Sequence, residues 1–261
     1  MIVRPLPDGL LLIRQPDHAA LAGALARAWG GPFPALRPRE PVELATRGHD
    51  DGWTEIDRAP VLDPRAGMPH TYRSLPTADA LDVAERSVAR VGAADPYAGW
   101  LVSRHFASFH MGSDVPQARA WITAQVGHRA ELLSRAWPRV GREALHPHVL
   151  EGNLDVLQLL DALSLALCES WPDWESREIS PACGEETTVF RYRRIESEGF
   201  AVRGCVSPWP FASAEVRSRV PARRLPPGPW PDAAALVRAW KAATSEALEV
   251  ALARGSIRAL R

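Results

Sequence analysis

Apolar residues recur at helical spacing through most of the first 170 positions. Between residues 18 and 29, Leu21, Leu25 and Trp29 share one face, and Asp17 stands where an N-cap would. The same periodicity predicts further helices over residues 42–49, 77–92, 95–109, 115–137 and 151–170. The helix over 151–170 has the widest apolar face, and Pro172 follows its end.

Alternating patterns predict strands near both ends of the chain. Residues 1–14 hold two short apolar runs around the turn Pro7-Asp8-Gly9. Three alternating segments follow the long helix, at 187–193, 200–206 and 215–220, and a closing amphipathic helix is predicted at about 232–253. Residues 57–80 are rich in Pro, Asp, Arg and Gly and predict a long irregular loop.

These elements predict a mainly α protein (α+β overall). Residues 1–175 are expected to form a helical, metal-binding core with a short N-terminal hairpin. Residues 176–261 are expected to form a small antiparallel β-meander and the closing helix, packed on that core.

Four polar residues in this helical context are candidate metal ligands. His18 lies in the first turn of one predicted helix, and the pair His49-Asp50 ends the next. Asp161 stands inside the apolar run Leu-Leu-Asp-Ala-Leu, where an unpaired buried carboxylate would cost several kcal/mol. Two imidazoles and two carboxylates suit Zn, Fe, Mn or Co, as one or two ions.

Each of these residues also has an ordinary structural explanation. Asp161 can pair with Arg104 or face water, and His18 can simply begin a helix. The pair His49-Asp50 can be a turn or capping element. The metal interpretation therefore requires that all four side chains meet at one point.

Other residues near these motifs are candidates for catalysis and substrate binding. His105 is expected to point inward, as a further metal ligand or as a general acid. Asp51 follows the His-Asp pair and can orient a ligating histidine or handle protons. Arg58 and Arg104 are candidates for holding a substrate anion through a bidentate guanidinium.

Composition narrows the class of protein. The 31 basic and 31 acidic residues give a net charge of zero, which argues against a nucleic-acid partner. Cys168, Cys183 and Cys205 form an odd set without CxxC spacing, as expected of free thiols in a reducing cytosol. With neither a leader pattern nor an apolar span, a soluble cytoplasmic protein is expected, and the ten tryptophans leave room for a homodimer face.

The order His18, His49-Asp50, Asp161 resembles the HD-domain superfamily of helical metal-dependent phosphohydrolases. That resemblance implies that these four residues ligate a metal and that His105 is an extra ligand. Many members place a Lys after the His-Asp pair, where this chain has Asp51-Gly52-Trp53. Arg58 or Arg104 would then hold the substrate anion.

Longer segments resemble an uncharacterised bacterial family known as a domain of unknown function. They are Met1-Ile2-Val3-Arg4, Gln15-Pro16-Asp17-His18-Ala19, His49-Asp50-Asp51-Gly52-Trp53, Ser103-Arg104-His105 and Asp161-Ala162-Leu163-Ser164-Leu165. This resemblance spans most of the chain and implies no established activity.

Together these residues predict a metal-dependent hydrolase of a small anionic substrate, most simply a phosphoester. Two alternatives stay open. The same ligands can hold two irons in an HD-like oxygenase, or the site can belong to a non-enzymatic sensor that binds a metal or an anion.

Overall fold

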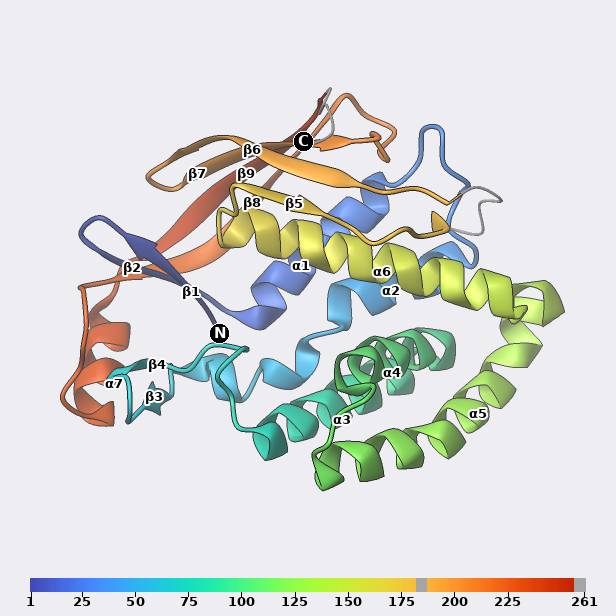
Figure 1. The fold of residues 1–261 in the computed structure, drawn as a ribbon, viewed down its shortest axis with the longest axis horizontal. Coiled ribbons are helices and arrows are strands. Elements are labelled where there is room, and N and C mark those ends of the chain that lie inside the picture. Colours follow the sequence, from blue (N-terminus) through green and yellow to red (C-terminus); the bar gives the residue numbers. More distant parts are fainter. Residues whose placement is uncertain (182–186, 256–261) are drawn as a thin grey trace.

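A computed structural model describes residues 1–181 and 187–255 and shows an α/β fold with about half of its residues in helices. A curled, seven-stranded mixed sheet lies at the top of Figure 1, and most of the helices lie below it. The prediction of a mainly α, HD-like core with a small C-terminal meander is therefore wrong. The N-terminal hairpin and the C-terminal strands join in one sheet, so strands contribute far more than an appendage.

The sheet has the order β1-β2-β8-β9-β7-β6-β5. Its strands are β1 (Ile2–Leu6), β2 (Gly9–Ile13), β5 (Asp173–Glu175), β6 (Arg191–Glu198), β7 (Ala201–Ser207), β8 (Glu215–Leu225) and β9 (Ser245–Arg254). β2 pairs antiparallel with β8, which links the two ends of the chain, and β7 pairs parallel with β9. A small hairpin of β3 (Leu62–Asp63) and β4 (Met68–Pro69) lies in the predicted loop.

The single closing helix predicted at 232–253 is also wrong. Only α7 (Ala233–Ala242) is helical, and β9 then runs between β8 and β7. Leu248, Val250 and Leu252 are buried on alternate positions of this strand. The spacing of Leu248 and Leu252 also fits a helix, and the pairing with two neighbouring strands decides between the two structures.

The predicted helices before residue 170 are confirmed, with shifted ends. They are α1 (Gln15–Ala28), α2 (Arg39–Gly48), α3 (Thr77–Ala94), α4 (Pro96–His110), α5 (Pro116–Ala144) and α6 (Pro147–Cys168). Two 3₁₀ turns, η1 (Asp51–Trp53) and η2 (Ile56–Arg58), follow α2. α1 begins before the expected cap at Asp17, because Pro16 in its first turn fits a helix start.

The core explains how the candidate ligands reach the interior. α1 packs against α2, α6 and β8, and α6 is buried along nearly its whole length. Leu157, Leu160 and Leu163 have no exposed surface, so the position of α6 is fixed by packing on both sides of Asp161.

Cys168 and Cys205 are free and buried, as expected, and Cys183 lies outside the described residues. Among residues 1–181 and 187–255, no helix combines the length and the apolar character that crossing a membrane requires.

Candidate metal centre

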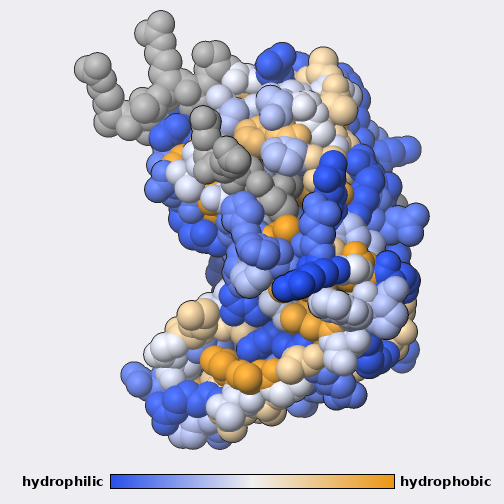
Figure 2. All heavy atoms as spheres, turned by 90° about the vertical axis from the view of Figure 1, so that its right-hand side faces the viewer, coloured by the Kyte–Doolittle hydropathy of each residue, from blue (hydrophilic) through white to orange (hydrophobic). Residues whose placement is uncertain are grey.

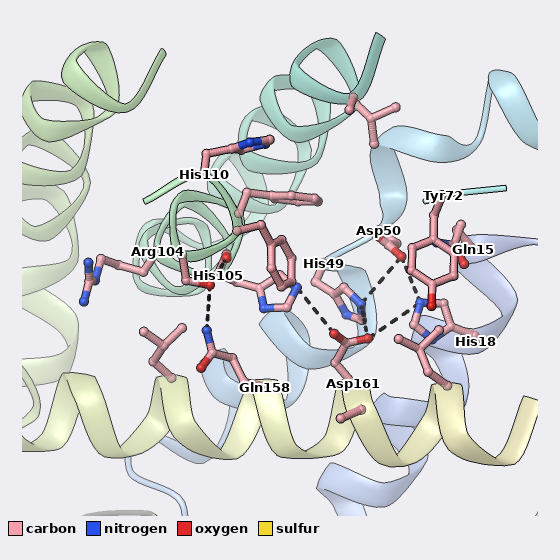
Figure 3. A pocket seen from close by; sticks show the side chains of 18 of the residues that line it. Gln15, His18, His49, Asp50, Tyr72, Arg104, His105, His110, Gln158 and Asp161 are labelled. Atoms are coloured by element: carbon pink, nitrogen blue, oxygen red, sulfur yellow. Dashed lines mark hydrogen bonds and ion pairs between the residues drawn. The ribbon is translucent and has the colours of Figure 1, made fainter. Parts of the chain in front are cut away.

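The four candidate ligands meet at one point inside the protein. His18 comes from the first turn of α1, His49 and Asp50 follow the end of α2, and Asp161 comes from the middle of α6. Figure 3 shows these side chains gathered around Asp161. Oδ1 of Asp161 lies 3.4 Å from Nε2 of His49 and 3.9 Å from Nε2 of His18. The convergence that the metal interpretation requires is present.

A neighbouring serine fixes the orientation of His18. The hydroxyl of Ser164 donates to the carbonyl of Asp161 at 2.8 Å, and its oxygen lies 2.9 Å from Nδ1 of His18. Because its single hydrogen is already used, Ser164 accepts a hydrogen bond from Nδ1–H of His18. Nε2 of a neutral His18 is then a lone pair, and it faces Oδ2 of Asp50 at 2.8 Å.

The backbone fixes the orientation of His49 in the same way. Its Nδ1 lies 2.9 Å from the carbonyl oxygen of Thr46, which can only accept, so Nδ1 carries a hydrogen. Nε2 of His49 is fully buried and has no hydrogen-bond partner. It points to the carboxylates of Asp161 at 3.4 Å and Asp50 at 3.7 Å.

The lone pair of a neutral imidazole repels a carboxylate oxygen that it faces. This repulsion can be relieved in two ways. A proton on the imidazole relieves it, and so does a cation bound between the ligand atoms. Burial disfavours the charged form of His49, but Asp50 and Asp161 outweigh it and raise the pKa to about 9. Burial acts to raise the pKa of the Asp50 and Asp161 carboxyls, but the histidines hold both below their usual value.

The residues fit a metal ion. One ligand atom each from His18, His49 and Asp161 lie within 4.8 Å of one another, so this group can hold a metal ion. Asp50 lies beside it and is 5% exposed. Hydrogen bonds from the second ring nitrogen, as made to Ser164 and Thr46, are the usual way in which proteins orient metal-ligating histidines.

His105 lies next to this group but outside it. Its Nε2 is 3.7 Å from Oδ2 of Asp161, on the side away from His18, and its buried Nδ1 has no hydrogen-bond partner. The ring packs edge-on against Phe109 at 4.7 Å. Burial lowers the pKa of His105 to about 4, despite the nearby carboxylate of Asp161.

Comparison with known proteins places the chain in a family without assigning it an activity. The family described as protein of unknown function (DUF3891) matches residues 1–227. The chain belongs to this family. The expected resemblance to a domain of unknown function is confirmed, whereas the resemblance to the HD-domain superfamily is not. No curated protein and no solved structure matches the chain.

In this DUF3891 protein the remaining candidates lie in different places. Arg104 lines the cavity beside the centre and pairs with Glu151 at 2.8 Å rather than with Asp161. Asp51 is half-buried in η1, and burial raises its pKa despite the nearby Arg47. Arg58 is exposed and lines a smaller pocket elsewhere, so it is not part of the cavity at the metal centre.

The centre opens into a cavity of about 770 Å³. Figure 2 shows the molecule hollowed on one side, between the part that carries the sheet and the lower helices. The cavity is lined by α4, α6 and the loop before α3, and Figure 3 shows Tyr72, Gln158 and His110 around it. Sequence reasoning missed Tyr72, Gln158 and Arg177 as lining residues. They carry no local signal and reach the cavity only through the tertiary fold.

Proposed function

We propose that this DUF3891 protein is a hydrolase of phosphoesters that uses one divalent metal ion. One observation carries the proposal: two buried histidines, each held through Nδ1, present Nε2 to the same carboxylate of Asp161. Both nitrogens face only acceptor oxygens, so each needs either its own proton or a bound cation. The mixed nitrogen and oxygen set favours Zn, Mn, Fe or Co.

The surroundings of His105 favour one ion over two. A second ion near Oδ2 of Asp161 would have His105 as its other ligand. Phe106 and Phe109 flank that ring. Within residues 1–181 and 187–255, the triad His18, His49 and Asp161 is the one group with metal-ligand spacing. His105 is therefore better suited to proton transfer than to ligating a second ion.

The positions of these residues suggest a separate role for each in phosphoester hydrolysis. His18, His49 and Asp161 would hold the divalent ion, which would acidify a bound water and polarise a phosphoryl oxygen. Asp50 lies beside the ligand set, where its carboxylate can accept a hydrogen bond from the attacking water. His105, neutral near pH 7 because of its low pKa, can take the proton of that water as the new P–O bond forms. The same proton then passes to the leaving oxygen as the old P–O bond breaks.

A second candidate function is supported by the ligand types. Two histidines and one carboxylate are also the set that holds iron in many non-haem oxygenases. The placement of Asp50 favours the hydrolase, because a second carboxylate beside the ligand set can orient a water for attack.

The test is an activity assay on protein loaded with single metals. Protein stripped of metal is reloaded with Mn²⁺, Zn²⁺, Co²⁺ or, without oxygen, Fe²⁺, and bis(p-nitrophenyl) phosphate hydrolysis is measured. We expect turnover that needs added metal and disappears in Asp161→Asn. Oxygen consumption by the iron form would favour the oxygenase, and bound metal without turnover of any phosphoester would favour a sensor.

A further inference from the structure

Beyond the metal centre, the walls of the 770 Å³ cavity are mainly apolar. The apolar lining comes from Trp53, Val83, Phe106, Phe109, Leu154 and Leu165. Phe109 is 62% exposed, and the neighbouring cavity residue Met111 is 69% exposed. Large apolar side chains are costly to expose, and two of them on the lip of one cavity mark a surface that an apolar ligand can cover.

The arginines of the cavity already have partners. Arg104 pairs with Glu151, which also lines the cavity. The guanidinium of Arg177 pairs with Asp155, and its Nη2 donates to Oε1 of Gln158 at 3.3 Å. Each guanidinium is thus matched by one carboxylate, so the two pairs add no net positive charge beside the metal centre.

The metal centre has no surplus positive charge either. Two carboxylates, those of Asp50 and Asp161, lie at the ligand set, and a divalent ion balances their charge. The cavity as a whole is therefore close to neutral once the ion is bound. Sites for polyphosphates and phosphomonoester dianions instead collect unpaired Arg and Lys around the phosphate.

We propose, on the basis of the hydrolase function above, that the substrate is a small phosphodiester whose substituents are apolar. Its phosphoryl group carries a single negative charge and lies at the metal centre. One aromatic or aliphatic substituent lies against Phe106, Phe109 and Leu154. Nucleotide polyphosphates and phosphomonoesters are poor ligands, because each additional negative charge lacks a free cation.

The direct test compares ligands that differ in charge and apolar size. Calorimetric titration of the metal-loaded protein at about pH 8, where a phosphomonoester is a dianion, uses diphenyl phosphate, phenyl phosphate and inorganic pyrophosphate. We expect diphenyl phosphate to bind at least about tenfold more tightly than either of the others, since it buries a second ring at lower charge. Tighter binding of phenyl phosphate or pyrophosphate would overturn the proposal.

Two variants locate the preference in this cavity. Glu151→Gln frees Arg104, so the preference for diphenyl phosphate over phenyl phosphate should fall by about two- to fivefold. Phe109→Ser should weaken the binding of both diphenyl phosphate and phenyl phosphate, because a ring of either ligand can lie against Phe109. Val126→Ser, at an exposed apolar position on α5, is the control and should change neither. Unchanged ligand preference in Glu151→Gln, together with unchanged diphenyl phosphate affinity in Phe109→Ser, would contradict the assignment.

The outcome also separates this proposal from the hydrolase function. Selective binding of diphenyl phosphate without turnover of any diester would contradict hydrolysis and keep the assignment of the cavity. Turnover with a preference for dianionic monoesters would keep hydrolysis and overturn the assignment of the cavity.

Discussion

Nε2 of His49 lies 3.4 Å from Oδ1 of Asp161, although His49 ends α2 and Asp161 lies in the middle of α6. Both side chains are buried, and that nitrogen has no hydrogen-bond partner. A buried acceptor that faces another acceptor is unfavourable unless a proton or a bound cation lies between them. This relationship is the physical basis of the proposed metal centre.

Ser164 should matter for metal affinity although it cannot itself reach the ion. Its oxygen accepts from Nδ1–H of His18 and fixes which nitrogen faces the centre. We expect Ser164→Ala to weaken metal binding by about 10- to 100-fold, measured by competition with a chelating dye. Ser103→Ala removes an equally buried helical serine that bonds Gln125, and it should leave affinity unchanged. Equal effects of the two variants would contradict the orienting role.

His105 should affect turnover more than metal content. Its ring lies next to Asp161 but outside the ligand triad. His105→Gln is expected to keep the bound metal and to lower kcat by about 10²- to 10⁴-fold, as for loss of a general acid or base. Metal analysis and steady-state kinetics on the same preparation separate the two effects. Loss of the metal would instead make His105 a ligand.

The stability of the metal-free protein should depend on pH through His49. The pKa of His49 is raised to about 9 from its usual 6.5, so its charged form is stabilised in the folded state. That contribution is fully present below about pH 6.5 and is lost as pH rises through 9. Urea unfolding of wild type and His49→Gln should show a difference that shrinks over this range. A difference independent of pH would contradict the assigned charge.

Metal affinity should change with pH in the opposite direction. The ion needs a neutral imidazole, so binding must displace the proton that His49 holds in the metal-free protein. We expect affinity to rise between about pH 6.5 and 9, and calorimetry in buffers of different ionisation enthalpy should show release of a proton. Affinity that stays constant over this range would show that His49 is neutral before the ion binds.

β9 should contribute strongly to stability because it fills the middle of the sheet. Leu252 has no exposed surface, whereas Glu249 lies on the exposed face and pairs with Arg219. Leu252→Ala is expected to lower the free energy of unfolding by about 2–5 kcal/mol. Glu249→Ala should change it by less than about 1 kcal/mol. Similar values for both variants would contradict the described orientation of the strand.

The candidate ligands could be predicted from sequence because their surroundings are chemically unusual. Asp161 interrupts an apolar helix, and such a carboxylate needs a partner wherever the helix packs. Ser164 is part of the same helical face, but nothing in the sequence distinguishes it from a small residue that only packs in the core. Its role depends on the approach of His18 from α1, which is a tertiary contact.

The fold class could not be predicted because the pairing that joins the two ends of the chain in one sheet leaves no local signal in the sequence. Residues 245–254 are rich in Ala, Glu and Leu and have a high helix propensity. They form a strand because the backbone of β9 is hydrogen-bonded to β7 on one side and to β8 on the other. Likewise, nothing local shows that β2 pairs with β8. Long-range pairing of this kind overrides local propensity.

The metal content of the purified protein decides whether His18, His49 and Asp161 hold an ion. Protein prepared without chelator or a nickel column is measured by elemental analysis, together with His49→Ala, Asp161→Ala and the exposed control His148→Ala. We predict about one transition-metal ion per chain in wild type and in His148→Ala, and loss of most of it in the other two variants. Wild-type protein that stays free of metal even after incubation with Zn²⁺, Mn²⁺, Co²⁺ and Fe²⁺ would contradict the account.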